Sequence, residues 1–305
     1  MNCMFCSDDK HPYDLEEGHI DDLVRRAIKK GITPLKVLRA ACVNPVKHYG
    51  LDVGLLQQGD AADFIVVDNL DNFDILETYI TGDKVSNKGK TLLKYQKSRV
   101  INNFNVSQKK PSDFRVPYKK GRIKIIETTE GELLTKLKLD LPKRNGDYIV
   151  SDTDKDVLKI AVVNRYQNCK PQVGFIKNFG LKKGALASSV AHDSHNIIAV
   201  GVDDKDICDA VNYVIENQGG FSATYQGNNY VLPLPIAGLL SDQDYHSVNQ
   251  QYKKIYSFAR ELGTNLHAPY TTLSFMGLLV IPEIKISDKG LFDGTKFQLT
   301  ELYEN

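Results

Sequence analysis

Two polar clusters hold the side chains that are best suited to chemistry. The central cluster consists of His192, Asp193, Ser194, His195 and Asn196, and it lies between two apolar runs. Imidazole and carboxylate groups can bind metals, transfer protons and orient substrates. Because apolar runs flank the cluster, it is predicted to lie at the mouth of a buried element. A purely structural interpretation stays open, in which Asp193 or Ser194 caps a helix or a turn and both histidines bond to backbone carbonyls.

The second cluster follows the apolar segment Asn2–Cys6, which is predicted to form a strand. Asp8, Asp9 and His11 lie in the polar loop directly after this strand. In α/β barrels, the loops at the carboxyl ends of strands carry the active site. Asp8 is therefore a candidate catalytic residue, and Asp9 and His11 are candidates for orienting it. The alternative is that all three are ordinary exposed loop residues.

Cys3 and Cys6 form a C-x-x-C pair. A zinc or redox site would need a second such pair or a thioredoxin-like context, and the sequence has neither. The total of five cysteines is odd and does not indicate a secreted disulfide framework. Both cysteines are therefore predicted to be strand residues.

The composition is that of an ordinary globular protein. The chain has 305 residues, of which 42% are hydrophobic and 25% charged, with a net charge of +1. No apolar stretch approaches the ~18 residues of a membrane-spanning helix, and the first residues do not resemble a secretory signal. We therefore expect a cytoplasmic protein that binds neither nucleic acid nor membranes.

The elements that must position the clusters follow from apolar periodicity. Three helices are predicted between residues 20 and 50, followed by a small β region at residues 62–84. The segment from residue 84 to 124 has thirteen Lys or Arg against one acid, and a solvated linker is favoured there over a nucleic-acid-binding patch. A domain boundary is expected near residues 100–115.

The rest of the chain mixes strands and helices. Hairpins are predicted at residues 122–139 and 221–234, the latter with its turn at Gly227-Asn228-Asn229, and strands at residues 157–163, 173–177 and 196–200. Helices are predicted at residues 204–217 and after a capping box formed by Ser241 and Asp244. This pattern indicates an α+β domain of roughly 190 residues.

Three stretches together resemble the adenine deaminase family of the amidohydrolase superfamily. They are CMFCSDDKHPYDLEEGHIDDLVRRAI, GFIKNFGLKKGALASSVAHDSHNIIAVG and TLSFMGLLVIPEIKISDKGLFDG. The resemblance implies a combined α/β and α+β architecture. Residues 1–48 would be the last strand and helices of a (β/α)8 barrel, 49–100 β-sandwich strands, 101–121 a basic linker, and 122–305 the C-terminal domain.

The resemblance also implies a reaction, in which adenine and water give hypoxanthine and ammonia at a binuclear iron or manganese centre through attack of a metal-bound hydroxide at C6. Asp8 matches the family's strand-eight aspartate, which contacts the metal and handles the proton. The family's His-x-His ligands are absent from this sequence. Six further residues would then line the substrate pocket or contact the metal ligands without binding the metal themselves. They are Asp9, His11, His192, Asp193, His195 and Asn196.

Three hypotheses follow. The chain is the C-terminal portion of an adenine deaminase and is inactive alone, and the N-terminal part is encoded separately, missing from this sequence or supplied by another chain. The expected partners are adenine and a separate N-terminal half or a homo-oligomer. Alternatively, it is a non-catalytic remnant that acts as a binding or scaffold domain. In the third and weakest hypothesis, His192, Asp193 and His195 form a metal centre of their own.

Overall fold

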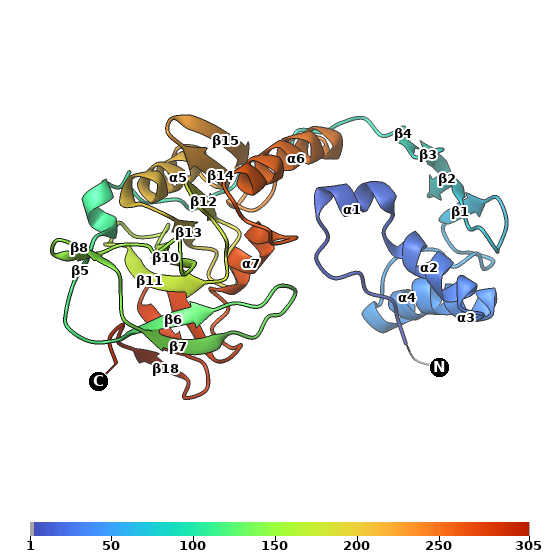
Figure 1. Cartoon of the computed structure of the whole chain (residues 1–305). Helices are drawn as coiled ribbons and strands as arrows, with labels where there is room; N and C mark the ends of the chain where they lie inside the picture. Colours follow the sequence, from blue (N-terminus) through green and yellow to red (C-terminus); the bar gives the residue numbers. More distant parts are fainter. Residues whose placement is uncertain (1–2, 305) are drawn as a thin grey trace. The chain divides into compact units, whose positions relative to one another are not determined.

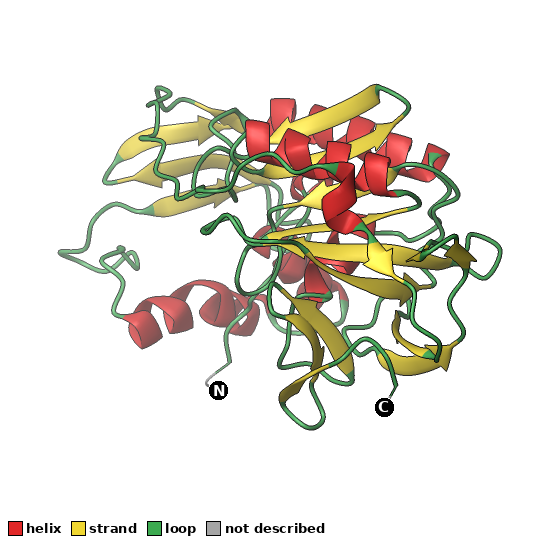
Figure 2. Cartoon of the chain, turned by 90° about the vertical axis from the view of Figure 1, so that its left-hand side faces the viewer, coloured by secondary structure: helices red, strands yellow, loops and turns green. Residues whose placement is uncertain are grey.

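The computed structural model describes residues 3–304. The chain divides into two compact units, one ending at Lys97 and the other beginning at Ser98 (Figure 1). Both units contain helices and strands. Figure 2 shows this mixture of helices and strands, which confirms that the chain is of mixed α and β structure. No closed barrel is present within the described residues. None of the helices in that part of the chain is long and apolar enough to cross a membrane.

The helical part of the first unit begins the chain. Its elements are α1 (Pro12–Glu17), α2 (Ile20–Lys29), α3 (Pro34–Leu38), the π-helical η1 (Arg39–Val43) and α4 (Asn44–Tyr49). Helix α2 buries Val24 and Ala27 on one face, as its apolar spacing predicts. Gly50 ends α4 in the left-handed conformation that glycine adopts without strain. The predicted helices between residues 20 and 50 are therefore confirmed.

A four-stranded antiparallel sheet completes the first unit. Its strands follow chain order: β1 (Phe64–Val67), β2 (Ile75–Ile80), β3 (Asp83–Asn87) and β4 (Lys90–Thr91). Thr81-Gly82 forms the tight turn between β2 and β3, where Gly82 has a positive φ of 88°. Strand β1 is an edge strand that pairs only with β2 among the described strands.

An eight-stranded sheet forms the centre of the second unit. In spatial order its strands are β15 (Asn228–Pro233), β14 (Gly220–Tyr225), β12 (Ala185–Ser188), β13 (Ile197–Gly201), β10 (Val157–Val163), β11 (Gln172–Lys177), β6 (Ile123–Glu127) and β7 (Lys136–Asp140). All neighbours pair antiparallel except β11 and β6. Two smaller sheets are formed by β5 (Val116–Pro117), β9 (Tyr148–Ile149) and β8 (Arg144–Asn145), and by β16 (Ile284–Ser287), β17 (Gly290–Asp293) and β18 (Gln298–Thr300).

Helices cover both faces of this large sheet. Helix α5 (Asp204–Glu216) packs with Ala161 and Val163 of β10, whereas α6 (Tyr245–Glu261) and α7 (Pro269–Phe275) share a core with Ile160 and Val162 of the same strand. Alternate residues of β10 therefore face different helices. This arrangement explains why β10 is a continuous apolar run, since both of its faces are buried.

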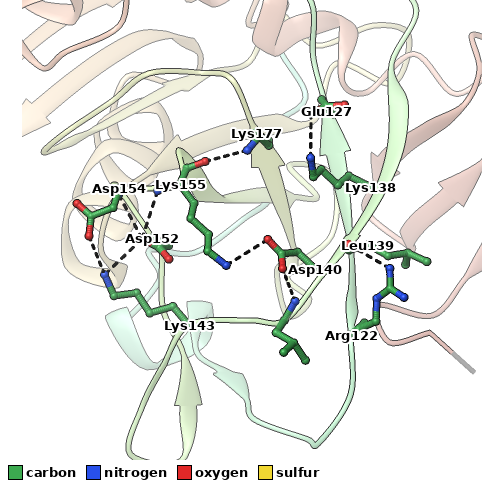
Figure 3. A network of polar contacts seen from close by, with 11 residues as sticks. Arg122, Glu127, Lys138, Leu139, Asp140, Lys143, Asp152, Asp154, Lys155 and Lys177 are labelled. Atoms are coloured by element: carbon green, nitrogen blue, oxygen red, sulfur yellow. Dashed lines mark hydrogen bonds and ion pairs between the residues drawn. The ribbon is translucent and has the colours of Figure 1, made fainter.

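Ion pairs join β6 to β7, β7 to the loop before β10, and that loop to the segment after β7 in the second unit (Figure 3). The pairs are Glu127–Lys138, Asp140–Lys155 and Lys143–Asp152, with N–O distances of 3.8, 3.3 and 3.4 Å. Exposed pairs of this kind contribute about 0–1 kcal/mol each. Burial of the apolar core, rather than this network, therefore holds the sheet together.

The predicted strand at Asn2–Cys6 is wrong for its described part, because Cys3–Cys6 forms no strand. A parallel barrel strand needs a neighbouring strand on each side to satisfy its backbone groups. Instead of pairing with a strand, the Phe5 backbone nitrogen donates a long hydrogen bond, 3.4 Å, to the Ala40 carbonyl in the helical segment η1. Cys3 and Cys6 are exposed free thiols rather than strand residues.

The solvated-linker prediction is also wrong for part of the basic segment. The Lys109 ammonium donates to Asn168 Oδ1 at 2.7 Å, and Phe114 in η2 (Pro111–Phe114) is fully buried. The continuously exposed connection is shorter and earlier, at residues 91–101. The boundary between the two units along the chain lies between Lys97 and Ser98, before the expected boundary at residues 100–115.

Two turn predictions need smaller corrections. The turn of the β14–β15 hairpin is Gln226-Gly227, because Tyr225 pairs with Asn228. Helix α6 is capped by Asp244, whose side chain accepts from the Ser247 backbone nitrogen, and the predicted capping box with Ser241 does not form.

Candidate functional site

Asp8 lies at an exposed turn in the first unit. Its φ is 56°, and its Oδ1 accepts a hydrogen bond from the Asp9 backbone nitrogen at 2.8 Å. The Ser7 hydroxyl lies 2.7 Å from His19 Nε2, in reach of the start of α2. An aspartate tolerates positive φ better than most residues because its short side chain bonds locally. The loop therefore leaves the Asp8 side chain exposed to solvent.

Asp9 and His11 have different environments. Asp9 is exposed. His11 is half-buried, its backbone nitrogen donates to Asp14 Oδ2 at 3.3 Å, and its ring stacks on Tyr13 with centroids 5.2 Å apart. These contacts place His11 at the start of α1, where it helps to define the end of the Asp8 loop.

The described residues of this chain do not fit a complete metal centre. Among residues 3–304, no three His, Cys, Asp or Glu side chains are grouped so that they can hold a metal ion. A catalytic zinc-type centre normally takes three protein ligands, and Asp8 supplies one carboxylate. A metal bound at Asp8 would need ligands from outside this chain.

The central cluster occupies the turn between β12 and β13 in the second unit. The His195 backbone nitrogen donates to the Ala191 carbonyl at 2.7 Å, and His195 has a φ of 52°. Asn196 is buried, and its Oδ1 accepts from the Arg165 backbone nitrogen at 3.2 Å. Asn196 therefore joins the start of β13 to the segment that follows β10.

His192 packs against α7. Its ring stacks on Phe275 with centroids 5.0 Å apart and an interplanar angle of 15°. The His192 Nδ1 lies 3.9 Å from Asp193 Oδ1, but the Asp193 side chain is 78% exposed. The ring centroids of His192 and His195 are 6.1 Å apart. The structure thus brings the two histidines together without forming the separate metal centre of the third hypothesis.

His195 has an unusual electrostatic environment. Burial lowers its pKa below the ordinary value, and the nearby His192 and Arg165 lower it further. Its Nδ1 is buried and has no hydrogen-bond partner, so the expectation that both histidines bond to backbone carbonyls is wrong for this atom. Burial and the neighbouring positive charges therefore favour the neutral form of the His195 imidazole.

Arg165 and Tyr166 also belong to this site, although the sequence analysis did not select them. Arg165 is 4% exposed. Its guanidinium donates to the Ala237 carbonyl at 2.7 Å and to the Tyr166 hydroxyl at 3.0 Å. The Tyr166 hydroxyl donates to the Ser194 carbonyl at 2.9 Å. One sequence feature could have identified them: the polar triplet Asn164-Arg165-Tyr166 directly follows a buried apolar strand. This triplet lies at the end of the sheet where β13 begins.

Comparisons with known proteins identify the class and then the family. Residues 1–98 match the model of the amidohydrolase family, a class of hydrolases that generally use a metal. Residues 132–298 match the model described as the adenine deaminase C-terminal domain. This match covers more than half of the chain, and the chain belongs to that family.

Curated relatives agree with this assignment. Proteins named adenine deaminase from Salinibacter ruber, Sulfurovum and Methanosarcina barkeri are 51%, 51% and 48% identical to this chain, each over 98% of it. The chain covers only 55%, 55% and 56% of their lengths. It therefore spans little more than half of the curated relatives it matches, and the resemblance seen in the sequence is confirmed.

Proposed function

We propose that this chain is the C-terminal portion of an adenine deaminase, which converts adenine and water to hypoxanthine and ammonia. The observation that carries the proposal is the identity of 51% over 98% of the chain to the Salinibacter ruber adenine deaminase, 55% of which is covered. Adenine is then the substrate, and the proposed partners are a separate N-terminal half and further copies of this chain. The part of the enzyme that this chain lacks would come from the N-terminal half. The proposed location is the cytoplasm.

Asp8 is the proposed catalytic residue and metal ligand of this chain. In the reaction, water adds to C6 of the purine, the C–N bond to the amino group breaks, and ammonia leaves. A carboxylate can take the proton from the water and return it to the departing amine. The exposed Asp8 carboxylate is accessible for that role. The binuclear iron or manganese centre implied by the family would have most of its ligands outside this chain.

The other candidate residues have supporting roles in this proposal. Asp9 and His11 shape the Asp8 loop, and the stacking and hydrogen bonds of His11 support that role. His192, Asp193, His195 and Asn196 line or order a pocket. The buried Asn196 and the stacked His192 favour a role in positioning rather than in reacting with substrate.

A complementation assay tests the proposal. The chain is co-expressed with the part of the Salinibacter ruber enzyme that it lacks, in the presence of manganese or iron, and ammonia release from adenine is measured. The mixture is expected to be active, and Asp8→Ala is expected to lose at least about 100-fold in kcat, as for loss of an acid–base group. Asp71→Ala, another exposed carboxylate of the first unit, is the matched control and keeps full activity.

Two results would contradict the proposal. Conversion of adenine by the purified chain alone would show that its own residues suffice. Stable association of the two parts without any ammonia release would instead support the alternative function, a non-catalytic binding or scaffold domain. The observation that favours this alternative is that the described residues contain no three-ligand metal group.

A further inference from the structure

The turn that carries the central cluster is held by two segments that are distant from each other in the sequence. From α7, the Phe275 ring stacks on the His192 ring, with centroids 5.0 Å apart. From the segment after β10, the Arg165 backbone nitrogen donates to Asn196 Oδ1 at 3.2 Å. The first and last residues of the central cluster are therefore each fixed to a different part of the second unit.

The Tyr166 hydroxyl fixes the middle of the turn. Arg165 donates to this hydroxyl at 3.0 Å, and the hydroxyl lies 2.9 Å from the Ser194 carbonyl. A guanidinium group can only donate, so the hydroxyl oxygen accepts from Arg165 and its single proton goes to Ser194. Arg165 is itself buried and anchored to the Ala237 carbonyl at 2.7 Å. The direction of the Tyr166 hydroxyl is therefore fixed, and it fixes the Ser194 carbonyl in turn.

A close backbone approach fixes the turn from the α7 side. Gly277 lies two residues after α7, and a Cβ atom at this position would be 2.9 Å from the His192 carbonyl oxygen. This distance is shorter than ordinary van der Waals contact, so Gly277→Ala would displace the His192 backbone. Gly277 does not have a positive φ, so its backbone conformation itself accepts alanine. The glycine is therefore required for the close approach and not for its conformational freedom.

The tip of the turn is exposed although its base is fixed. The Asp193 side chain is 78% exposed, and Ser194 is also exposed. His195, the next residue, has a φ of 52°, a left-handed conformation that is unfavourable for a residue with a Cβ atom. Strain of this kind persists where surrounding contacts determine the conformation, and it is concentrated at functional sites. The fold therefore holds a strained turn in place with a carboxylate and a hydroxyl at its tip.

We propose that Tyr166 and Gly277 are positioning residues for adenine binding, because they fix the turn that carries Asp193 and Ser194. A carboxylate accepts hydrogen bonds and a hydroxyl both donates and accepts them, which suits the amino group and ring nitrogens of a purine. This inference rests on the proposed function, in which the central cluster lines or orders a pocket. The chemical step belongs to Asp8 and the metal centre, so the expected effect is on the affinity for adenine.

Steady-state kinetics of the complemented enzyme test the inference. The chain is combined with the part of the Salinibacter ruber enzyme that it lacks and with manganese, and KM and kcat for adenine are measured. Tyr166→Phe is expected to raise KM by about fivefold and to keep kcat within about twofold, because loss of one hydrogen bond weakens binding by about this factor. Gly277→Ala displaces the same turn from the other segment and is expected to raise KM as well.

The matched control is Tyr148→Phe, at a tyrosine of β9 that is 39% exposed. Its KM and kcat are expected to equal those of the wild-type chain. Circular dichroism and thermal unfolding confirm that each variant is folded.

A purely structural role of Tyr166 gives a different result. It would reduce the folded fraction of Tyr166→Phe, which lowers kcat and leaves KM unchanged, and that result overturns the inference. Wild-type KM in both Tyr166→Phe and Gly277→Ala also overturns it, while ammonia release by the same mixtures still supports the proposed function. A wild-type mixture that releases no ammonia instead overturns the proposed function, and the inference fails with it.

Discussion

The His192 ring stacks almost parallel on the Phe275 ring, with centroids 5.0 Å apart. This contact joins the turn after β12 to helix α7, two segments that are far apart in the sequence. Phe275 also packs against the apolar core beneath α6 and α7. The stacked pair therefore holds the central cluster against helix α7.

Phe275→Ala is expected to reduce the free energy of unfolding by about 2–3 kcal/mol, somewhat below the cost for a fully buried phenylalanine. The physical reason is loss of apolar burial and of the stacked pair. Urea unfolding measures the effect, and the imidazole proton resonances of His192 should shift as the ring current disappears. Phe297→Ala is the control: Phe297 is 69% exposed, and its loss should cost less than about 1 kcal/mol. Equal costs for the two variants would contradict the prediction.

His195 is expected to make folding stability fall as the pH decreases below about 6.5, the ordinary pKa of histidine. Because burial lowers the pKa of His195 in the folded state, the unfolded state binds a proton first as the pH falls. His195→Asn should remove this part of the pH dependence, and asparagine tolerates the positive φ. Urea unfolding between pH 5 and 8, about the histidine range, measures it.

The control for this experiment is His267→Asn, at an exposed histidine. It should keep the same dependence of stability on pH as the wild-type chain. If the two variants give the same slope, His195 is not the group responsible.

Asp206 is expected to lower the stability of the folded state at neutral pH. Burial, together with the neighbouring Asp203 charge, raises the pKa of Asp206 to about 6. The folded state therefore prefers the protonated acid, and stability falls as the pH rises from the ordinary pKa of ~3.9 to about 6. Asp206→Asn should raise the free energy of unfolding at pH 7 by about 1–3 kcal/mol, with the difference vanishing near pH ~4.

Unfolding in urea at the two pH values checks this prediction. Asp154→Asn is the matched control, since the Asp154 side chain is 91% exposed. A gain at pH 7 that persists undiminished in acid would show that the effect of Asp206→Asn is not electrostatic.

Lys285 is expected to destabilise the fold below its own pKa. The residue is fully buried in β16, its ammonium donates to the Leu133 carbonyl at 2.7 Å, and burial lowers its pKa to about 8. Stability should therefore rise with pH between about 8 and 10.4, where the unfolded state retains more protons. Lys285→Met should stabilise the chain at pH 7 by about 1–2 kcal/mol, after loss of the hydrogen bond.

The measurement is the difference in unfolding free energy between Lys285→Met and the wild-type chain at pH 7 and 10. Lys289→Met, at a lysine whose side chain is 65% exposed, should change neither value by more than about 0.5 kcal/mol. A Lys285→Met variant that is less stable at both pH values would show that the Leu133 contact dominates.

Several elements were predictable because their signals are local. The apolar stripes of α2 and α5 and the Thr81-Gly82 turn depend on residues only a few positions apart. Strand β12 was missed, because its Ala-Leu-Ala-Ser sequence has little intrinsic strand preference. It forms because β13 and β14 pair with it on both sides.

The sequence by itself determined the family, the order of most helices and strands, and the two clusters that could do chemistry. Only the tertiary structure decided that His192 stacks on Phe275, that Arg165 lies beneath the central cluster, and that an apolar groove runs along β1. Local periodicity records which face of an element is apolar. It does not record which distant element covers that face, or whether any part of the chain covers it at all, because those outcomes depend on contacts between residues far apart in the sequence.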